Sequence, residues 1–109
     1  MTFDELITLD TFTFDVTQDD IDGATKCCST HCPIARAINR TMELKYGSAS
    51  VLGTNYCHPI SIARSIRTHP FDRNYLSFLH STESEQFVKD FDNDRPIKPT
   101  TLTIKKAYT

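Results

Sequence analysis

Cysteine and histidine are the residue types in this sequence best suited to chemistry, and all four cysteines and two of the four histidines occur in two groups. The groups are Cys27, Cys28, His31 and Cys32, then Cys57 and His58. A structural zinc site needs four nitrogen or sulfur ligands, usually supplied as two close pairs. Cys28 and Cys32 would make one pair, but the second pair consists of adjacent residues, which seldom both bind one tetrahedral ion. The spacing therefore argues against zinc, and we expect no resident metal or cofactor.

The same cysteines permit other interpretations. Cys32 precedes Pro33 at an expected helix N-terminus, where the helix dipole can lower a thiol pKa, and His31 or His58 could act as base. A disulfide would need an oxidising compartment, which nothing in the sequence indicates. Cysteine also packs as a small apolar residue, and the sequence has no Cys-x-x-Cys or glycine-rich nucleophile motif. We therefore expect no catalytic residue, while structural, metal-binding and reactive roles for the cysteines stay open.

Arginine supplies the candidate binding residues. The chain has three glycines, none in a phosphate-binding motif, but arginine binds anions in a bidentate manner without any glycine. Arg36 and Arg40 lie one turn apart on an expected helix, and Arg64 and Arg67 lie close together in a later segment. We predict that these four side chains form the binding surface, and that reversing their charges leaves the domain folded.

Charge is unevenly distributed, although the net charge is only −2. Residues 1–25 contain seven acids and no Lys or Arg, residues 26–80 carry a net charge of +5, and residues 95–109 contain four bases and no acid. Such segments either attract one another within the fold or present oppositely charged faces to partners. The acidic segments would oppose a phosphate backbone, which argues against binding of duplex nucleic acid.

The N-terminal segments have clear local patterns. Residues 11–16 alternate apolar and polar side chains, which predicts a half-buried strand. Thr17 followed by Asp20 has the spacing of a helix N-terminus, and Gly23 is expected to end that turn. Residues 6–9 fit either a short helical turn or an earlier strand.

The main helix is expected from Pro33 to about Tyr46. Pro33 suits the first helical position, and apolar side chains recur every four residues after it. Arg40 and Glu43 are spaced to pair on the polar face of this helix. Gly47 is the expected stop signal.

The second half of the chain mixes strand and helix patterns. Residues 50–56 favour a strand, and residues 59–67 fit a strand or a helix, with the β-branched content favouring the strand. A shorter helix is expected over 82–92, because Ser81 is a good cap and acids follow in the first turn. Residues 101–108 predict a last strand, on which two lysines would protect an exposed sheet edge.

These patterns predict one α+β domain over residues 1–109, with a small antiparallel or mixed sheet, one main helix and one shorter helix. No apolar run reaches membrane-spanning length, and acids stand where a signal peptide would be basic, so we expect a cytoplasmic protein without membrane association. The predicted core is Phe12, Phe14, Val16, Ile34, Ile38, Met42, Phe87, Val88, Phe91, Leu102 and Ile104.

Two blocks of the sequence carry a family resemblance. The stretch 16–23 (VTQDDIDG) followed by 32–38 (CPIARAI), and the later stretch 85–97, resemble small uncharacterised proteins encoded by tailed bacteriophages. That group has two residues between its paired cysteines, whereas this chain has three between Cys28 and Cys32 and an additional Cys27. The resemblance implies a phage-type accessory protein that acts in the cytoplasm of a bacterial host, and it brings no established activity.

From these observations we expect a non-enzymatic protein that binds a bacterial host protein, for host takeover or for inhibition of a defence system. Two alternatives stay open: sequestration of an anionic nucleotide-type ligand by an arginine-lined site, and a zinc-stabilised or cysteine-dependent module. The sequence also leaves homo-oligomerisation open.

Overall fold

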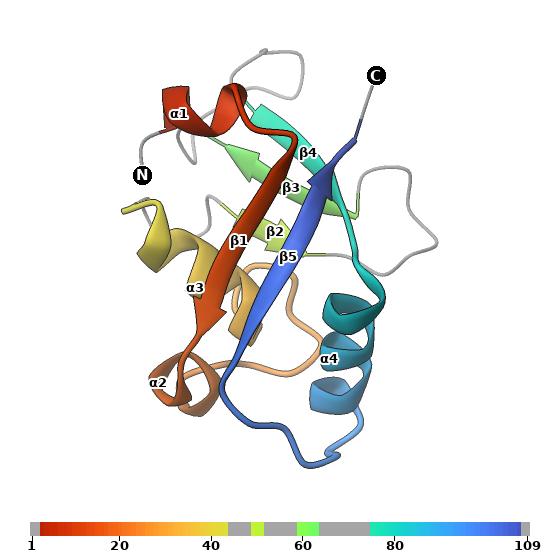
Figure 1. Cartoon of the computed structure of the whole chain (residues 1–109). Helices are drawn as coiled ribbons and strands as arrows, with labels where there is room; N and C mark the ends of the chain where they lie inside the picture. Colours follow the sequence, from red (N-terminus) through yellow and green to blue (C-terminus); the bar gives the residue numbers. More distant parts are fainter. Residues whose placement is uncertain (1–2, 44–48, 52–58, 64–74, 108–109) are drawn as a thin grey trace.

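Five strands form one antiparallel sheet in the computed structural model, which describes residues 3–43, 49–51, 59–63 and 75–107 (Figure 1). The strands in their order across the sheet are β1 (Thr11–Val16), β5 (Thr100–Lys106), β4 (Tyr75–Leu79), β3 (Ile60–Ala63) and β2 (Ala49–Val51). All four strand pairs are antiparallel. Together with the helices, this sheet makes a small single α+β domain, as predicted.

The longest ladder joins the two ends of the chain. β1 pairs with β5 along its whole length, and Phe12 and Phe14 lie opposite Ile104 and Leu102. These four side chains are buried, whereas the intervening residues of β1 are exposed. The strand predicted over 11–16 is therefore confirmed, including which of its faces enters the core.

The helices number four in the described part of the chain: the main and the shorter predicted helices, and two short ones near Thr17 and residues 6–9, where the sequence patterns indicated helical turns. They are α1 (Phe3–Ile7), α2 (Gln18–Asp22), α3 (Pro33–Thr41) and α4 (Thr82–Asp92). α3 packs against β1 and β2, whereas α4 lies along β5 (Figure 1). Of residues 6–9, for which a short helical turn was considered, the buried Leu6 and the exposed Ile7 form the end of α1.

Side-chain caps begin three of these helices. Thr17 forms a capping box with Asp20 at the start of α2, as the spacing predicted. Cys32 Sγ accepts a hydrogen bond from the Ala35 amide at the start of α3, and Ser81 caps α4 through the Ser84 amide. Such caps satisfy backbone donors that have no partner within the helix.

Two expectations are wrong: where the main helix ends, and that the last strand lies at an edge of the sheet. α3 ends at Thr41 with Met42 as its C-cap, and Glu43 adopts a left-handed backbone with φ of 54°, which ends a helix. The expected end at Tyr46 and stop at Gly47 lie outside the described residues. β5 lies between β1 and β4, and its C-terminal part, which carries Lys105 and Lys106, is paired on both sides, so these lysines protect no sheet edge.

The ambiguous segment 59–67 is a strand where the structure describes it, since Ile60–Ala63 pairs with both β2 and β4. β2 covers 49–51, and the rest of the predicted 50–56 strand lies outside the described residues. The predicted core is buried except for Val88 and Phe91, which are partly buried on α4. Within the described ranges, no helix has the length and apolar character needed to cross a membrane.

Candidate functional site

Arg40, one of the predicted binding residues, lies against the acidic N-terminal segment. Its Nη2 donates to Asp20 Oδ2 at 3.0 Å and to the backbone oxygen of Asp15 at 2.7 Å, and its Nε donates to Asp20 Oδ1 at 3.4 Å. The pairing with Glu43 that the sequence suggested is therefore replaced by an ion pair with Asp20. This guanidinium joins α3 to α2 and to the end of β1.

Asp20 is buried, and both oxygens of its carboxylate accept hydrogen bonds from neighbouring residues. Burial alone would raise its pKa, but hydrogen bonds from Arg40 and from the amide and hydroxyl of Thr17, together with the charge of Arg40, lower the pKa below 3.8. Thr17 N lies 2.9 Å and Thr17 Oγ1 lies 3.0 Å from Asp20 Oδ2. The carboxylate therefore stays ionised at neutral pH and serves as an internal partner for Arg40.

Arg36 lies at the other end of α2. Its Nε donates to the backbone oxygen of Asp20 at 3.2 Å, and its Nη2 donates to that of Asp19 at 3.4 Å. These carbonyls belong to the second and third residues of the five-residue α2, and they point toward its C-terminal end, where a cation is favourable. The guanidinium lies directly over Gly23, because a Cβ built there would be 2.6 Å from Arg36 Cζ.

Of the four predicted arginines, Arg36 and Arg40 lie in the described part of the chain. Arg36 and Arg40 direct donors to Asp15, Asp19 and Asp20, so the acidic and basic segments attract one another within the fold here. Arg64 and Arg67 lie outside the described residues. The geometry indicates that Arg36 and Arg40 hold α2 in position against α3.

The loop of residues 24–32 before α3, which we call the cysteine loop, holds three polar side chains together. His31 Nδ1 lies 3.1 Å from Cys28 Sγ and 2.6 Å from Thr30 Oγ1. Cys27, with a left-handed backbone, donates its amide to Asp92 Oδ1 at 3.0 Å and so ties the loop to α4. Among the described residues, no group of three or more Cys, His, Asp or Glu is arranged to hold a metal ion, and Cys57 and His58 lie outside them.

Cys32 does not have the environment of a nucleophile. Burial raises its pKa to about 11, although hydrogen bonds from the Ala35 and Ile34 amides at the start of α3 oppose the increase. The helix start thus favours the thiolate, as considered from the sequence, but the loss of hydration outweighs it and the net pKa is raised. The packing role considered for this cysteine agrees with its burial in the core.

A different site appears along β5, where its backbone faces α4. Lys106 N donates to the Asp10 oxygen at 2.8 Å, so Lys106, Ile104 and Leu102 direct their backbone groups to β1. Because the direction of the backbone groups alternates along a strand, Thr101 and Thr103 direct their N–H and C=O groups to the side of β5 that faces away from β1. In the described part of the chain, β4 pairs with β5 at Lys105 and Lys106 and extends no further.

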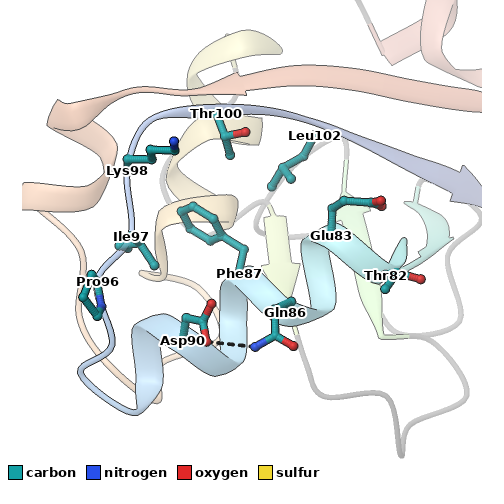
Figure 2. A pocket seen from close by; sticks show the side chains of 10 residues that line it. All are labelled: Thr82, Glu83, Gln86, Phe87, Asp90, Pro96, Ile97, Lys98, Thr100 and Leu102. Atoms are coloured by element: carbon teal, nitrogen blue, oxygen red, sulfur yellow. Dashed lines mark hydrogen bonds between the residues drawn. The ribbon is translucent and has the colours of Figure 1, made fainter.

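Two hollows follow this unpaired part of β5. One, of about 450 Å³, lies between α4 and residues 96–102, with Phe87, Ile97 and Leu102 as its apolar walls (Figure 2). The other, of about 360 Å³, continues along residues 101–105 beside His80 and Ser81. Glu83 and Leu102 line both. We refer to the two hollows and the backbone edge at Thr101 and Thr103 as the α4–β5 groove.

The helical wall of the groove is fixed at both of its ends. Ser84 is fully buried, and its hydroxyl donates to the Ser81 oxygen at 3.2 Å and lies 2.9 Å from His80 Nδ1. Beyond the other end of α4, Asp94 forms an ion pair with Lys26 of the cysteine loop. The groove therefore has a positioned wall before anything binds, which reduces the ordering that binding requires.

Sequence patterns did not indicate this groove. Its polar part is backbone, and two of its three apolar walls, Phe87 and Leu102, were assigned to the core. The sequence feature that could have indicated the groove is the end of β4 at Leu79, soon followed by α4. Beyond Leu79 the described part of the chain provides no strand beside β5, so part of the β5 backbone is left unpaired.

Comparisons of the chain with protein-family models, with curated proteins and with solved structures give no match.

Proposed function

We propose that this domain is a non-enzymatic binding protein that holds an extended segment of a protein partner in the α4–β5 groove. The segment adds to the free side of β5 as a short strand, and one of its side chains fills the hollow beside Phe87. The observation that carries the proposal is the unpaired backbone of Thr101 and Thr103 next to an apolar hollow. Strand addition with pockets for alternate side chains is a common mode of peptide recognition.

Backbone pairing supplies affinity in this arrangement, and the hollow supplies selectivity. Each new backbone hydrogen bond is worth about 0.5–1.5 kcal/mol net. Burial of one medium-sized apolar side chain adds about 1.5–3 kcal/mol. These contributions support a moderate affinity, in keeping with a short linear segment rather than a large interface.

The class of partner is proposed from the sequence resemblance. Its two blocks are similar to tailed-phage proteins, which makes a protein of the bacterial host the expected partner and the host cytoplasm the expected place. The function is then host takeover or inhibition of a defence system. The engagement of Arg36 and Arg40 with α2 favours this proposal over an arginine-lined site for an anionic ligand.

Two proline variants test the proposed mode directly. Thr103→Pro removes an amide that faces the groove, while Thr13→Pro removes an outward amide from the cross-strand partner of Thr103 on the far edge of β1. Peptides of eight randomised residues, displayed on yeast, are selected against the unmodified protein, and their affinities for both variants are then measured. We expect Thr103→Pro to abolish binding and Thr13→Pro to retain it.

Hydrogen exchange of the unmodified protein provides a second measurement that does not depend on folding of a variant. A bound peptide is expected to protect the amides of Thr101 and Thr103 and to leave those of Thr11 and Thr13 unchanged. Selected peptides that protect neither groove amide, or the absence of any binding peptide, would contradict the proposed function.

A further inference from the structure

The acidic side chains of α4 differ in whether the fold already uses them. Glu85 pairs with Lys89 at 2.9 Å, and Asp90 pairs with Arg95 at 3.3 Å and accepts a hydrogen bond from Gln86. Asp92 accepts the amide of Cys27. Glu83 is exposed, and the described residues provide it with no hydrogen bond or ion pair.

Glu83 is also the carboxylate at the junction of the groove. It lines both hollows, next to β5 on one side and one helical turn before Phe87 on the other (Figure 2). Residues four apart on a helix are separated by about 6 Å along its axis. Side chains on one face of a strand repeat every two residues, which is about 6.6 Å. Glu83 and Phe87 can therefore contact two side chains, two positions apart, on one extended segment.

We propose that the α4–β5 groove selects an extended peptide in which a Lys or Arg faces Glu83 and an apolar side chain, two positions away, enters the hollow beside Phe87. This inference rests on the proposed function and specifies the chemistry of the partner. The ammonium or guanidinium neutralises a carboxylate that has no internal cation, and the apolar group meets Phe87, Ile97 and Leu102.

The remaining charges of the groove limit this basic preference to one position. Lys98 lies at one end of the groove and Lys105 at the other, and both are exposed. A second basic residue toward either end of the bound segment would face a like charge. The partner is therefore a segment with one central basic residue and neutral or acidic flanks, which differs from a polybasic tail.

The test compares peptide selection by the unmodified protein, by Glu83→Lys and by a control, Glu85→Gln, which alters another acid of the same helical turn. The probe is the yeast-displayed library of eight randomised residues, followed by synthetic peptides that carry Lys, Glu or norleucine at the central position. We expect the unmodified protein and Glu85→Gln to prefer Lys over Glu by about 3- to 10-fold, and Glu83→Lys to reverse that order.

Two outcomes separate failure of this inference from failure of the proposed function. If selected peptides protect the amides of Thr101 and Thr103 but show no basic preference, or if Glu83→Lys retains the preference, the inference is wrong and strand addition stands. If no peptide protects these amides, both are wrong.

Discussion

Arg40 Nη2 and Asp20 Oδ2 lie 3.0 Å apart, so the one buried carboxylate of α2 is paired with a half-exposed guanidinium of α3. Asp20 is at the same time the N3 residue of the capping box whose N-cap is Thr17. One carboxyl group therefore both starts α2 and attaches it to α3. Removing the charge from either partner affects both functions.

The first prediction concerns acid stability. The pKa of Asp20 in the folded protein is lowered below 3.8, so its ionisation stabilises the fold above that value, and this contribution is lost as pH falls through the folded pKa. Asp20→Asn should lower the free energy of unfolding at pH 7 and should flatten the decline of that free energy as pH falls below 3.8. Urea unfolding across that range measures the effect.

Asp19→Asn is the matched control, because Asp19 uses its backbone oxygen, rather than its exposed side chain, to bind Arg36. It should retain the acid dependence of the unmodified protein. An Asp20→Asn variant with an unchanged acid profile would show that another group controls the transition.

The second prediction concerns Arg40 itself. Arg40→Gln leaves a buried carboxylate without its cation and should cost about 1–2 kcal/mol, less than a fully buried pair because the Arg40 side chain is 49% exposed. Arg40→Glu should cost more, since it places a second carboxylate beside Asp20. The expectation that charge reversal leaves the fold undisturbed is thereby revised for Arg40, and thermal unfolding of both variants measures the difference.

The third prediction is that the effect of Gly23→Ala on stability depends on whether Arg36 is present. Its φ is −88°, which alanine adopts readily, but a Cβ there would displace the Arg36 guanidinium. Gly23→Ala should therefore be neutral or destabilising in the unmodified protein. In an Arg36→Ala background the same change should stabilise by about 0.4–1 kcal/mol, because it restricts only the unfolded chain. A double-mutant cycle by urea unfolding gives the coupling, and additive effects would contradict the packing of Arg36 over Gly23.

The fourth prediction concerns thiol reactivity. Burial raises the pKa of Cys32 to about 11, so iodoacetamide at pH 8 should modify Cys27 and Cys28 in the native protein well before Cys32. Peptide mass spectrometry gives the modification rate at each cysteine, and urea-unfolded protein is the control in which the rates converge. Ionisation of Cys32 should also destabilise the fold as pH rises from about 9 to 11, because the unfolded thiol ionises first. Rapid native alkylation of Cys32 would disprove its burial.

Local sequence patterns predicted the local structure well. The alternation of residues 11–16, the cap at Thr17 and the start of α3 at Pro33 all depend on neighbours within a few residues, and all are confirmed. The end of α3 was missed because Glu43 adopts a left-handed conformation that sequence favours only weakly outside Gly and Asn.

Features set by strand order could not be predicted in this way. Lys105 and Lys106 suggested an edge strand, but the pairing of the last strand with both β1 and β4 depends on the whole topology. The burial of Asp20 and the unpaired backbone at Thr101 also arise from contacts between distant segments. Segregated charge left open both attraction within the fold and oppositely charged faces for partners, and it did not indicate which residues would meet.

Arg40 has one further contact, to the backbone oxygen of Asp15, which lies on the outer edge of the sheet because β1 is the terminal strand. Exposed edges of this kind allow copies of a protein to associate into aggregates through strand pairing. The guanidinium covers a carbonyl that such pairing would use, on a strand whose other outward residues are threonines. We therefore expect Arg40 to oppose self-association of the folded protein, so its loss should increase light scattering at high concentration before the domain unfolds.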